Sequence, residues 1–254
     1  MKIIFFILFL PLVFYTSIVC AGDKSGNFTI AAASDLKYAM DEIIDNFKYQ
    51  YPDADIKVIY GSSGNFYRQI TKAAPFDIYF SADTSYPELL AKSGLTISDV
   101  KLYAIGRIVI WSSNLDAANL GIETLKNNSV HHIAIANPEH APYGKRAQEF
   151  MEHQHLTKEL QHKLVYGENI SQAAQFAYSG AAQAGIIALS LALSPQMQQR
   201  GSFWLIPNEF HSPLEQGYVL LKKAQNNPLA HLFSEYMASN ATRDILDKYG
   251  FTLP

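Results

Sequence analysis

Apolar runs alternate with amphipathic stretches along the chain, and the first such pair lies between residues 28 and 49. Residues 28–33 form a largely apolar run that is typical of a buried strand. Residues 35–49 carry one apolar face at helical spacing, made by Leu36, Ala39, Met40, Ile43, Ile44 and Phe47. Ser34 and Asp35 stand between the two patterns, and both residue types favour a helix N-cap. The pattern predicts a strand, a tight turn and a helix that starts where open α/β sheets bind ligands.

The same succession of strand, polar turn and helix recurs three more times. Residues 56–60 lead into the turn Gly61-Ser62-Ser63-Gly64, and residues 132–136 lead into a loop and a helix near Pro142. Residues 164–166 lead to Asn169, a good N-cap for a helix over 171–178. Further strands are expected at 76–80, 102–111, 184–189, 203–206 and 215–221, and closing helices at 228–237 and 242–248.

These elements predict an α/β protein of two lobes. Lobe I is expected to contain residues 22–104 together with 217–254, and lobe II residues 105–216. The apolar run 102–111 would cross from one lobe to the other, which suits a hinge made of two short strand-like segments.

The first 21 residues have the pattern of a secretory signal peptide. Lys2 precedes an apolar stretch, and Val19-Cys20-Ala21 provides the small residues that predict cleavage after Ala21. A membrane anchor is the alternative, and Cys20 raises the option of a lipid anchor, although the residues before it fit a lipidation motif poorly. Cys20 is the single cysteine, so a disulfide framework is not expected. The protein is therefore expected to be exported to the periplasm.

Composition narrows the possible ligands. Charged residues make up 17% of the 254 residues and the net charge is −3, which argues against nucleic acid or an acidic membrane surface as a partner. If the chain binds an anion, an excess of basic residues is not what attracts it.

Eight sequence blocks, in order along the chain, resemble the periplasmic molybdate-binding proteins, the capture subunits of molybdate ABC importers. They are AAASDLKYAM (31–40), GSSGNFYRQI (61–70), APFDIYFSAD (74–83), LYAIGRIVIW (102–111), IANPEHAPYGKRA (135–147), YGENISQA (166–173), AGIIALS (184–190) and EQGYVLL (215–221). The resemblance implies a two-lobed type II periplasmic binding protein that is not an enzyme. Each lobe would be a mixed sheet flanked by helices, with the ligand in the cleft between the lobes. It implies a monomer without a cofactor that captures molybdate, and also tungstate, and delivers it to a membrane permease.

The resemblance also implies which residues hold the oxyanion. Ser34 and Ser63 match the family's binding serines, while Tyr143 and Ile170 stand where the family offers backbone amides. Ala188 stands where one branch of the family has a tyrosine, which indicates a branch in which Tyr143 supplies the missing hydroxyl.

Asp35 is the awkward member of the expected site. A carboxylate beside a dianion would repel it by several kcal/mol at short range and low dielectric. We expect the Asp35 side chain to turn away and cap its own helix, so that only its N–H faces the ligand; the alternative is an N-cap without ligand contact.

The predicted helix starts provide a physical reason for anion binding. Four of them begin at Asp35, Ser63, Pro142 and Asn169, two in each lobe. Helix N-termini offer unpaired N–H groups and partial positive charge. A rigid ring of neutral donors would suit molybdate or tungstate and be too large for sulfate, because each buried donor left unpaired costs about 1–3 kcal/mol.

Other functions stay open at this point. Within the binding class, the ligand could be another oxyanion such as sulfate, or a metal chelate. An exported serine hydrolase is the alternative from another class, but a nucleophile elbow requires Gly-x-Ser-x-Gly and residue 65 is Asn. The eight histidines show no convergent set, so we expect no metal coordinated directly by side chains.

Overall fold

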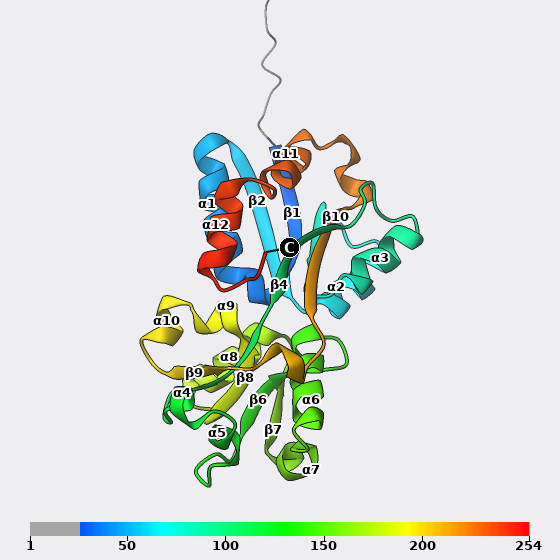
Figure 1. Cartoon of the computed structure of the whole chain (residues 1–254). Coiled ribbons are helices and arrows are strands. Elements are labelled where there is room, and N and C mark those ends of the chain that lie inside the picture. The colour runs from blue at the N-terminus through cyan, green and yellow to red at the C-terminus, as the bar shows by residue number, and fades with distance from the viewer. Residues whose placement is uncertain (1–25, 254) are drawn as a thin grey trace, which may run out of the picture.

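Two five-stranded mixed sheets, each flanked by helices, organise the chain (Figure 1). The structure is a computed structural model that describes residues 26–253. The expected α/β architecture of two lobes is confirmed. The expected signal peptide and Cys20 lie outside the described residues. None of the helices in residues 26–253 combines the length and the apolar character needed to span a bilayer.

Lobe I is built on a sheet with the strand order β2-β1-β3-β10-β4. Its strands are β1 (Gly26–Ala33), β2 (Ala54–Gly61), β3 (Ile78–Ser81), β4 (Lys101–Gly106) and β10 (Leu214–Leu220). Its helices are α1 (Lys37–Gln50), α2 (Ser63–Thr71), α3 (Ser85–Lys92), α11 (Pro228–Tyr236) and α12 (Asn240–Lys248). A 3-10 turn, η4 (Lys222–Asn226), leads into α11.

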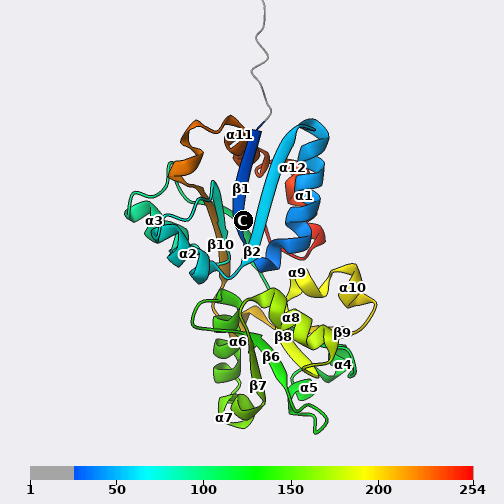
Figure 2. The same ribbon diagram turned by 180° about the vertical axis from the view of Figure 1, so that it is seen from behind.

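Alternation along the strands of lobe I divides its core between the two faces of the sheet. Ile30 and Phe80 pack with α1, α11 and α12, whereas Ala31 and Tyr79 pack with α2 and α3. Figures 1 and 2 show these two groups of helices on opposite sides of the sheet.

Lobe II has the strand order β7-β6-β8-β5-β9. Its strands are β5 (Ile108–Ser112), β6 (Ile133–Ala136), β7 (Leu164–Gly167), β8 (Ala184–Ala188) and β9 (Ser202–Leu205). Its helical segments are α4 (Ala117–Leu120), α5 (Glu123–Lys126), α6 (Pro142–His153), α7 (Thr157–Leu160), η2 (Gln161–Lys163), α8 (Ile170–Ser179), α9 (Leu189–Ala192), α10 (Pro195–Gln198) and η3 (Asn208–Phe210). The core contains Trp111, Ile133 and Phe150, all fully buried.

The chain crosses between the sheets twice. The apolar run that was expected to be one extended crossover is divided at Arg107: β4 belongs to the first sheet and β5 to the second. The return passes through η3 into β10, which pairs antiparallel with β3 and β4. These two crossings are the hinge region between the lobes; the lobe boundaries given above stay a prediction.

Parallel pairing brings the helix starts together at one edge of each sheet. In lobe I, β1 and β2 are parallel and their last residues, Ala33 and Gly61, are register partners. In lobe II, β6 and β7 are parallel, with Ala136 opposite Gly167. Each of these strands is followed closely by a helical segment, so both sheets direct two helix N-termini towards the other lobe (Figure 2).

Candidate functional site

A small cavity lies between the lobes where the four helix starts meet. The cavity has a volume of about 10 Å³ and is lined by Ala33, Ser34, Asp35, Gly61, Ser62, Ser63, Ala82, Ala141, Pro142, Tyr143 and Ile170. All five predicted site residues are therefore brought together by the fold. None of the residues that line this cavity is Lys or Arg, so any anion here would be held by neutral donors.

Local sequence explains three of the four helix starts. Gly61 and Ser62 end β2 and enter α2, and Pro142 occupies the first turn of α6, where a missing N–H costs nothing. Asn169 caps α8 as predicted, because its side chain accepts from the Gln172 N–H at 3.0 Å. The first N–H groups of these helices have no backbone partner within their own helix. Some of them are taken by neighbouring groups, because Gly64 donates to the His140 carbonyl, Ser171 to Ser34 Oγ and Gln172 to Asn169 Oδ1.

The fourth start differs from the prediction. Residues 34–36 form a 3-10 turn, η1 (Ser34–Leu36), before α1 begins at Lys37, and no side chain caps either segment. The expectation that Asp35 caps its own helix is therefore wrong. Its carboxylate turns inwards instead and is 1% exposed.

Asp35 is part of a buried network that joins the lobes at the hinge. The Tyr143 hydroxyl of lobe II donates to Asp35 Oδ2 at 2.9 Å, and Gln216 Nε2 on β10 donates to the same oxygen at 2.7 Å. Gln216 Nε2 also lies 3.0 Å from the Tyr143 hydroxyl, and Gln216 Oε1 accepts from Tyr103 on β4 at 2.5 Å. The second carboxylate oxygen, Oδ1, has no hydrogen-bond partner in residues 26–253.

Burial dominates the protonation of this network. Loss of solvent raises the pKa of Asp35 from its ordinary 3.8 to about 6, although hydrogen bonds from Gln216 and Tyr143 act in the opposite direction. Burial, together with the charge of Asp35, also raises the pKa values of Tyr143 and Tyr103. Both phenols therefore stay neutral at physiological pH, and Asp35 is the group in the network that titrates.

The position of Tyr143 bears on the expectation that its hydroxyl replaces the tyrosine that one branch of the family has at the position of Ala188. Its hydroxyl hydrogen is directed to Asp35 rather than to the cavity. Ala188 is fully buried at the end of β8. The expectation that the Tyr143 hydroxyl replaces a donor missing at Ala188 stays a prediction, whereas the backbone of Tyr143 starts α6 beside the cavity.

Ser34 links the lobes directly. Its hydroxyl donates to Asn169 Oδ1 at 3.1 Å and accepts from the Ser171 N–H at 3.2 Å, while Ser171 Oγ donates to the Ser34 carbonyl at 2.8 Å. Ser190 Oγ adds a hydrogen bond to the carbonyl of Asp35 at 2.8 Å. These contacts hold the turn of lobe I against the helix starts of lobe II.

Ser63 is held from within lobe I. The Ala82 N–H donates to Ser63 Oγ at 3.0 Å, and the Tyr79 hydroxyl donates to the Ser63 carbonyl at 2.8 Å. Within the described chain no acceptor contacts the Ser63 hydroxyl, so its hydrogen is free to donate into the cavity.

Ser62 and Gly64 touch the loop before α6 in lobe II. Ser62 Oγ lies 2.9 Å from His140 Nδ1, and the Gly64 N–H donates to the His140 carbonyl at 2.9 Å. His140 Nε2 is 3.6 Å from Glu168 Oε1, which is too long for a hydrogen bond, and that oxygen accepts from Asn65 Nδ2 at 2.6 Å. Ser62, His140 and Glu168 therefore lack the hydrogen bond that orients the histidine in a catalytic triad. This weighs against the serine hydrolase alternative.

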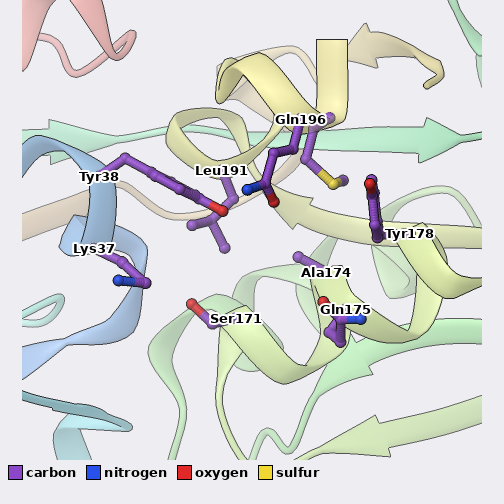
Figure 3. A pocket seen from close by; sticks show the side chains of 9 residues that line it. Lys37, Tyr38, Ser171, Ala174, Gln175, Tyr178, Leu191 and Gln196 are labelled. Atoms are coloured by element: carbon purple, nitrogen blue, oxygen red, sulfur yellow. The ribbon is translucent and has the colours of Figure 1, made fainter. Parts of the chain in front are cut away.

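A second hollow opens at the same interface, beside the cavity. Figure 3 shows Lys37 and Tyr38 of α1 on one side, and Ser171, Ala174 and Gln175 of α8 facing them. Lys37 Nζ is engaged by Asp41 at 2.9 Å, so its charge is already partly neutralised. Ser171, which bonds Ser34, connects this groove to the cavity.

Sequence reasoning missed Gln216, Tyr103, His140 and Ser190. Gln216 lies in a block that was interpreted as a strand and as part of the family resemblance, with no role given to its side chain. An amide on a strand that is expected to be buried indicates a buried hydrogen-bond partner. This was the signal that the sequence offered. Within residues 26–253 no group of three His, Cys, Asp or Glu residues is placed to hold a metal ion.

Comparison with known proteins agrees with this geometry. Residues 28–252 match the family of bacterial extracellular solute-binding proteins, and the chain belongs to that family. The molybdate-binding protein ModA of Azotobacter vinelandii is 34% identical over 239 residues, covering 93% of each chain. ModA of Rhodobacter capsulatus is 36% identical over 194 residues, covering 76% of this chain and 75% of the relative.

A solved structure also resembles this chain. The periplasmic molybdate-binding protein of Azotobacter vinelandii superimposes with a TM-score of 0.83 at 30% identity, covering 89% of this chain and 99% of that one. The resemblance to molybdate-binding proteins that was inferred from the eight sequence blocks is therefore confirmed.

Proposed function

We propose that this protein captures molybdate, and also tungstate, in the periplasm and delivers it to the membrane permease of an ABC importer. It acts as a monomer, and it binds its ligand without chemical conversion. The observation that carries the proposal is the interlobe cavity, where four helix starts from two lobes converge without a cationic side chain. The molybdate-binding relatives, which align over most of the chain, support it.

Five residues would hold the oxyanion. Ser34 and Ser63 contribute from lobe I, and Ser63 has a hydroxyl hydrogen free to donate. The N–H groups of Asp35, Tyr143 and Ile170 contribute from three helix starts, where the partial positive charge of the peptide dipoles favours an anion. Molybdenum would thus be bound as an oxyanion through its oxygens, with no direct bond to a side chain.

Selectivity in this proposal follows from size and from donor geometry. Molybdate and tungstate are larger tetrahedral dianions than sulfate. A ring of donors spaced for the larger ions would leave some N–H groups unpaired around sulfate, at a cost of about 1–3 kcal/mol each.

A thermal-shift series tests the function. A ligand that binds only the folded state raises the melting temperature in proportion to the logarithm of its concentration over its Kd. Molybdate and tungstate at 1 mM should each raise it by several degrees, while sulfate and phosphate at the same concentration should leave it within one degree. A shift with sulfate alone would contradict the proposed selectivity.

Two serine variants locate the site. Ser63→Ala removes the free hydroxyl and should reduce molybdate affinity at least tenfold, which corresponds to about 1.4 kcal/mol. Ser93→Ala is the matched control, because Ser93 is exposed at the end of α3 and bonds only the Leu89 carbonyl. Equal affinities for the two variants would refute the assignment of Ser63.

A further inference from the structure

The unpaired oxygen of Asp35 marks a second kind of contact in the cavity. Asp35 is fully buried, lines the cavity, and has Oδ2 saturated by Tyr143 and Gln216. Oδ1 makes no hydrogen bond of normal geometry in residues 26–253, although the backbone N–H groups of Asp35 and Leu36 lie close enough to the carboxyl group to lower its pKa. A buried polar atom without a partner is uncommon and calls for an explanation.

A carboxylate and a dianion cannot share so small a space without a proton. Two like charges a few ångströms apart at low dielectric repel strongly, and paired carboxylates resolve the same conflict by retaining one proton between them. The donors on Oδ2 cannot lend that proton, because the Tyr143 hydroxyl already donates and Gln216 is an amide. The vacant position for it is Oδ1.

We propose that Asp35 binds the oxyanion in its neutral form, donating a hydrogen bond from Oδ1 to a ligand oxygen, so that each captured dianion brings one proton into the cavity. This inference rests on the proposed function and deepens it by naming a further ligand contact. It also adds a criterion for selectivity: the hydrogen bond strengthens with the basicity of the acceptor, and molybdate and tungstate are stronger bases than sulfate.

The side chains that face Asp35 are uncharged, so Asp35 is the group among them that titrates. Tyr143 on α6 and Tyr103 on β4 face it and are held neutral by burial, β10 contributes the uncharged Gln216, and α9 contributes Ser190 to its backbone. Burial raises the pKa of Asp35 to about 6, so above neutral pH the free protein must take up the proton on binding. His140, bonded to Ser62, is another titratable group in contact with the cavity wall.

The substitution Asp35→Asn tests whether Asp35 binds the ligand as a neutral donor, since asparagine is a close mimic of neutral aspartic acid. Its carbonyl oxygen would accept from Tyr143 and Gln216, and its amide nitrogen would donate from the Oδ1 position without any proton uptake. Asp41→Asn is the matched control, because Asp41 pairs with Lys37 outside the cavity.

The experiment is calorimetric titration with molybdate between pH 6 and 8.5, repeated in two buffers of different ionisation enthalpy. The native protein and Asp41→Asn should take up close to one proton per molybdate at pH 8, and their affinity should fall about tenfold per pH unit above pH 7. Asp35→Asn should take up none, keep a constant affinity, and bind more tightly than the native protein at pH 8.

Three outcomes would overturn the inference. Binding by the native protein without proton uptake would do so, as would proton uptake that persists in Asp35→Asn and therefore comes from another group. Loss of molybdate binding by a folded Asp35→Asn protein at every pH would show that the carboxylate is needed as an acceptor. Absence of molybdate binding by the native protein at every pH would instead overturn the proposed function, and the inference with it.

Discussion

Asp35 and Tyr143, which are 108 residues apart, form a buried hydrogen bond of 2.9 Å that closes one side of the interlobe cavity. The bond joins the first turn of lobe I to the first turn of α6 in lobe II. Gln216 on the hinge strand β10 contacts both partners. Lobe closure, the hinge and the ligand site therefore share one polar network. Substitutions in this network should change the stability of the protein and its affinity for the ligand to different extents.

The first prediction concerns stability without ligand. Asp35 has a higher pKa in the folded protein, about 6, than its ordinary 3.8, so the folded state binds the proton more tightly than the unfolded chain. Its contribution to the free energy of unfolding is therefore greatest below pH 4, falls as the pH rises from about 4 to about 6, and is then constant. The total loss is about 3 kcal/mol for two pKa units.

Urea unfolding of the native protein and Asp35→Asn at pH 4 and pH 7.5 checks this. The variant should be close to the native protein at pH 4 and more stable by up to about 3 kcal/mol at pH 7.5. Asp41→Asn, which removes a half-exposed ion pair, should differ by less than about 1 kcal/mol at both values. Identical pH profiles for the native protein and Asp35→Asn would contradict the prediction.

Gly106 should be intolerant of a side chain. A Cβ at this last residue of β4 would lie 2.3 Å from the Tyr143 hydroxyl and 2.6 Å from Gln216 Nε2. Gly106→Ala should force these groups away from Asp35, at a cost of about 1–3 kcal/mol, and should weaken molybdate binding at least tenfold. Calorimetry measures the affinity; Gly26→Ala, where a Cβ meets nothing closer than 4.0 Å, should match the native protein.

Gly64 should affect binding more than stability. A Cβ there would lie 2.8 Å from the His140 carbonyl oxygen across the interface. Gly64→Ala should hinder lobe closure and lower molybdate affinity at least tenfold. The same Cβ would lie 2.9 Å from the Tyr86 hydroxyl in lobe I, which must shift. Because alanine favours a helix over glycine by up to about 1 kcal/mol, this cost is offset and unfolding without ligand should change little. A variant that binds normally would show that this contact is not required for the bound state.

Ser34→Ala should accelerate ligand release. The substitution removes one hydrogen bond to Asn169 and one from the Ser171 N–H, both across the interface. At about 1 kcal/mol for each bond, closure should be weakened by roughly 2 kcal/mol, or about thirtyfold in affinity. Stopped-flow displacement of molybdate by tungstate should show most of the change in the dissociation rate. A purely slower association would argue against a closing role.

Local sequence signals were sufficient to locate the helix starts. Apolar strand runs, the turn around Ser63, Pro142 and the Asn169 cap each act over a few residues. The structure places Ser63, Pro142 and Ile170, the residue after the Asn169 cap, at the cavity. Parallel pairing then follows from the strand-turn-helix succession. The same signals predicted the two-lobed fold.

The orientation of Asp35 could not be predicted in this way. Aspartate at a helix start normally caps the helix, and that preference is local. The partners that turn it inwards, Tyr143 and Gln216, are 108 and 181 residues away. Their arrangement depends on how the two lobes meet at the hinge, and this information is not present in any short window of sequence.

Ala33, Gly61, Ala136 and Gly167 end the four strands that point towards the other lobe. Residues this small place main chain, not removable side chains, at these four strand ends. Shortening a side chain there cannot enlarge the space, and lengthening one can only fill it. Of these four residues Ala33 and Gly61 line the cavity, so its width there depends on how closely the lobes approach. Adapting such a protein to an oxyanion of another radius would therefore begin at Gly106, Arg107 and Ile108, where the chain passes from one sheet to the other.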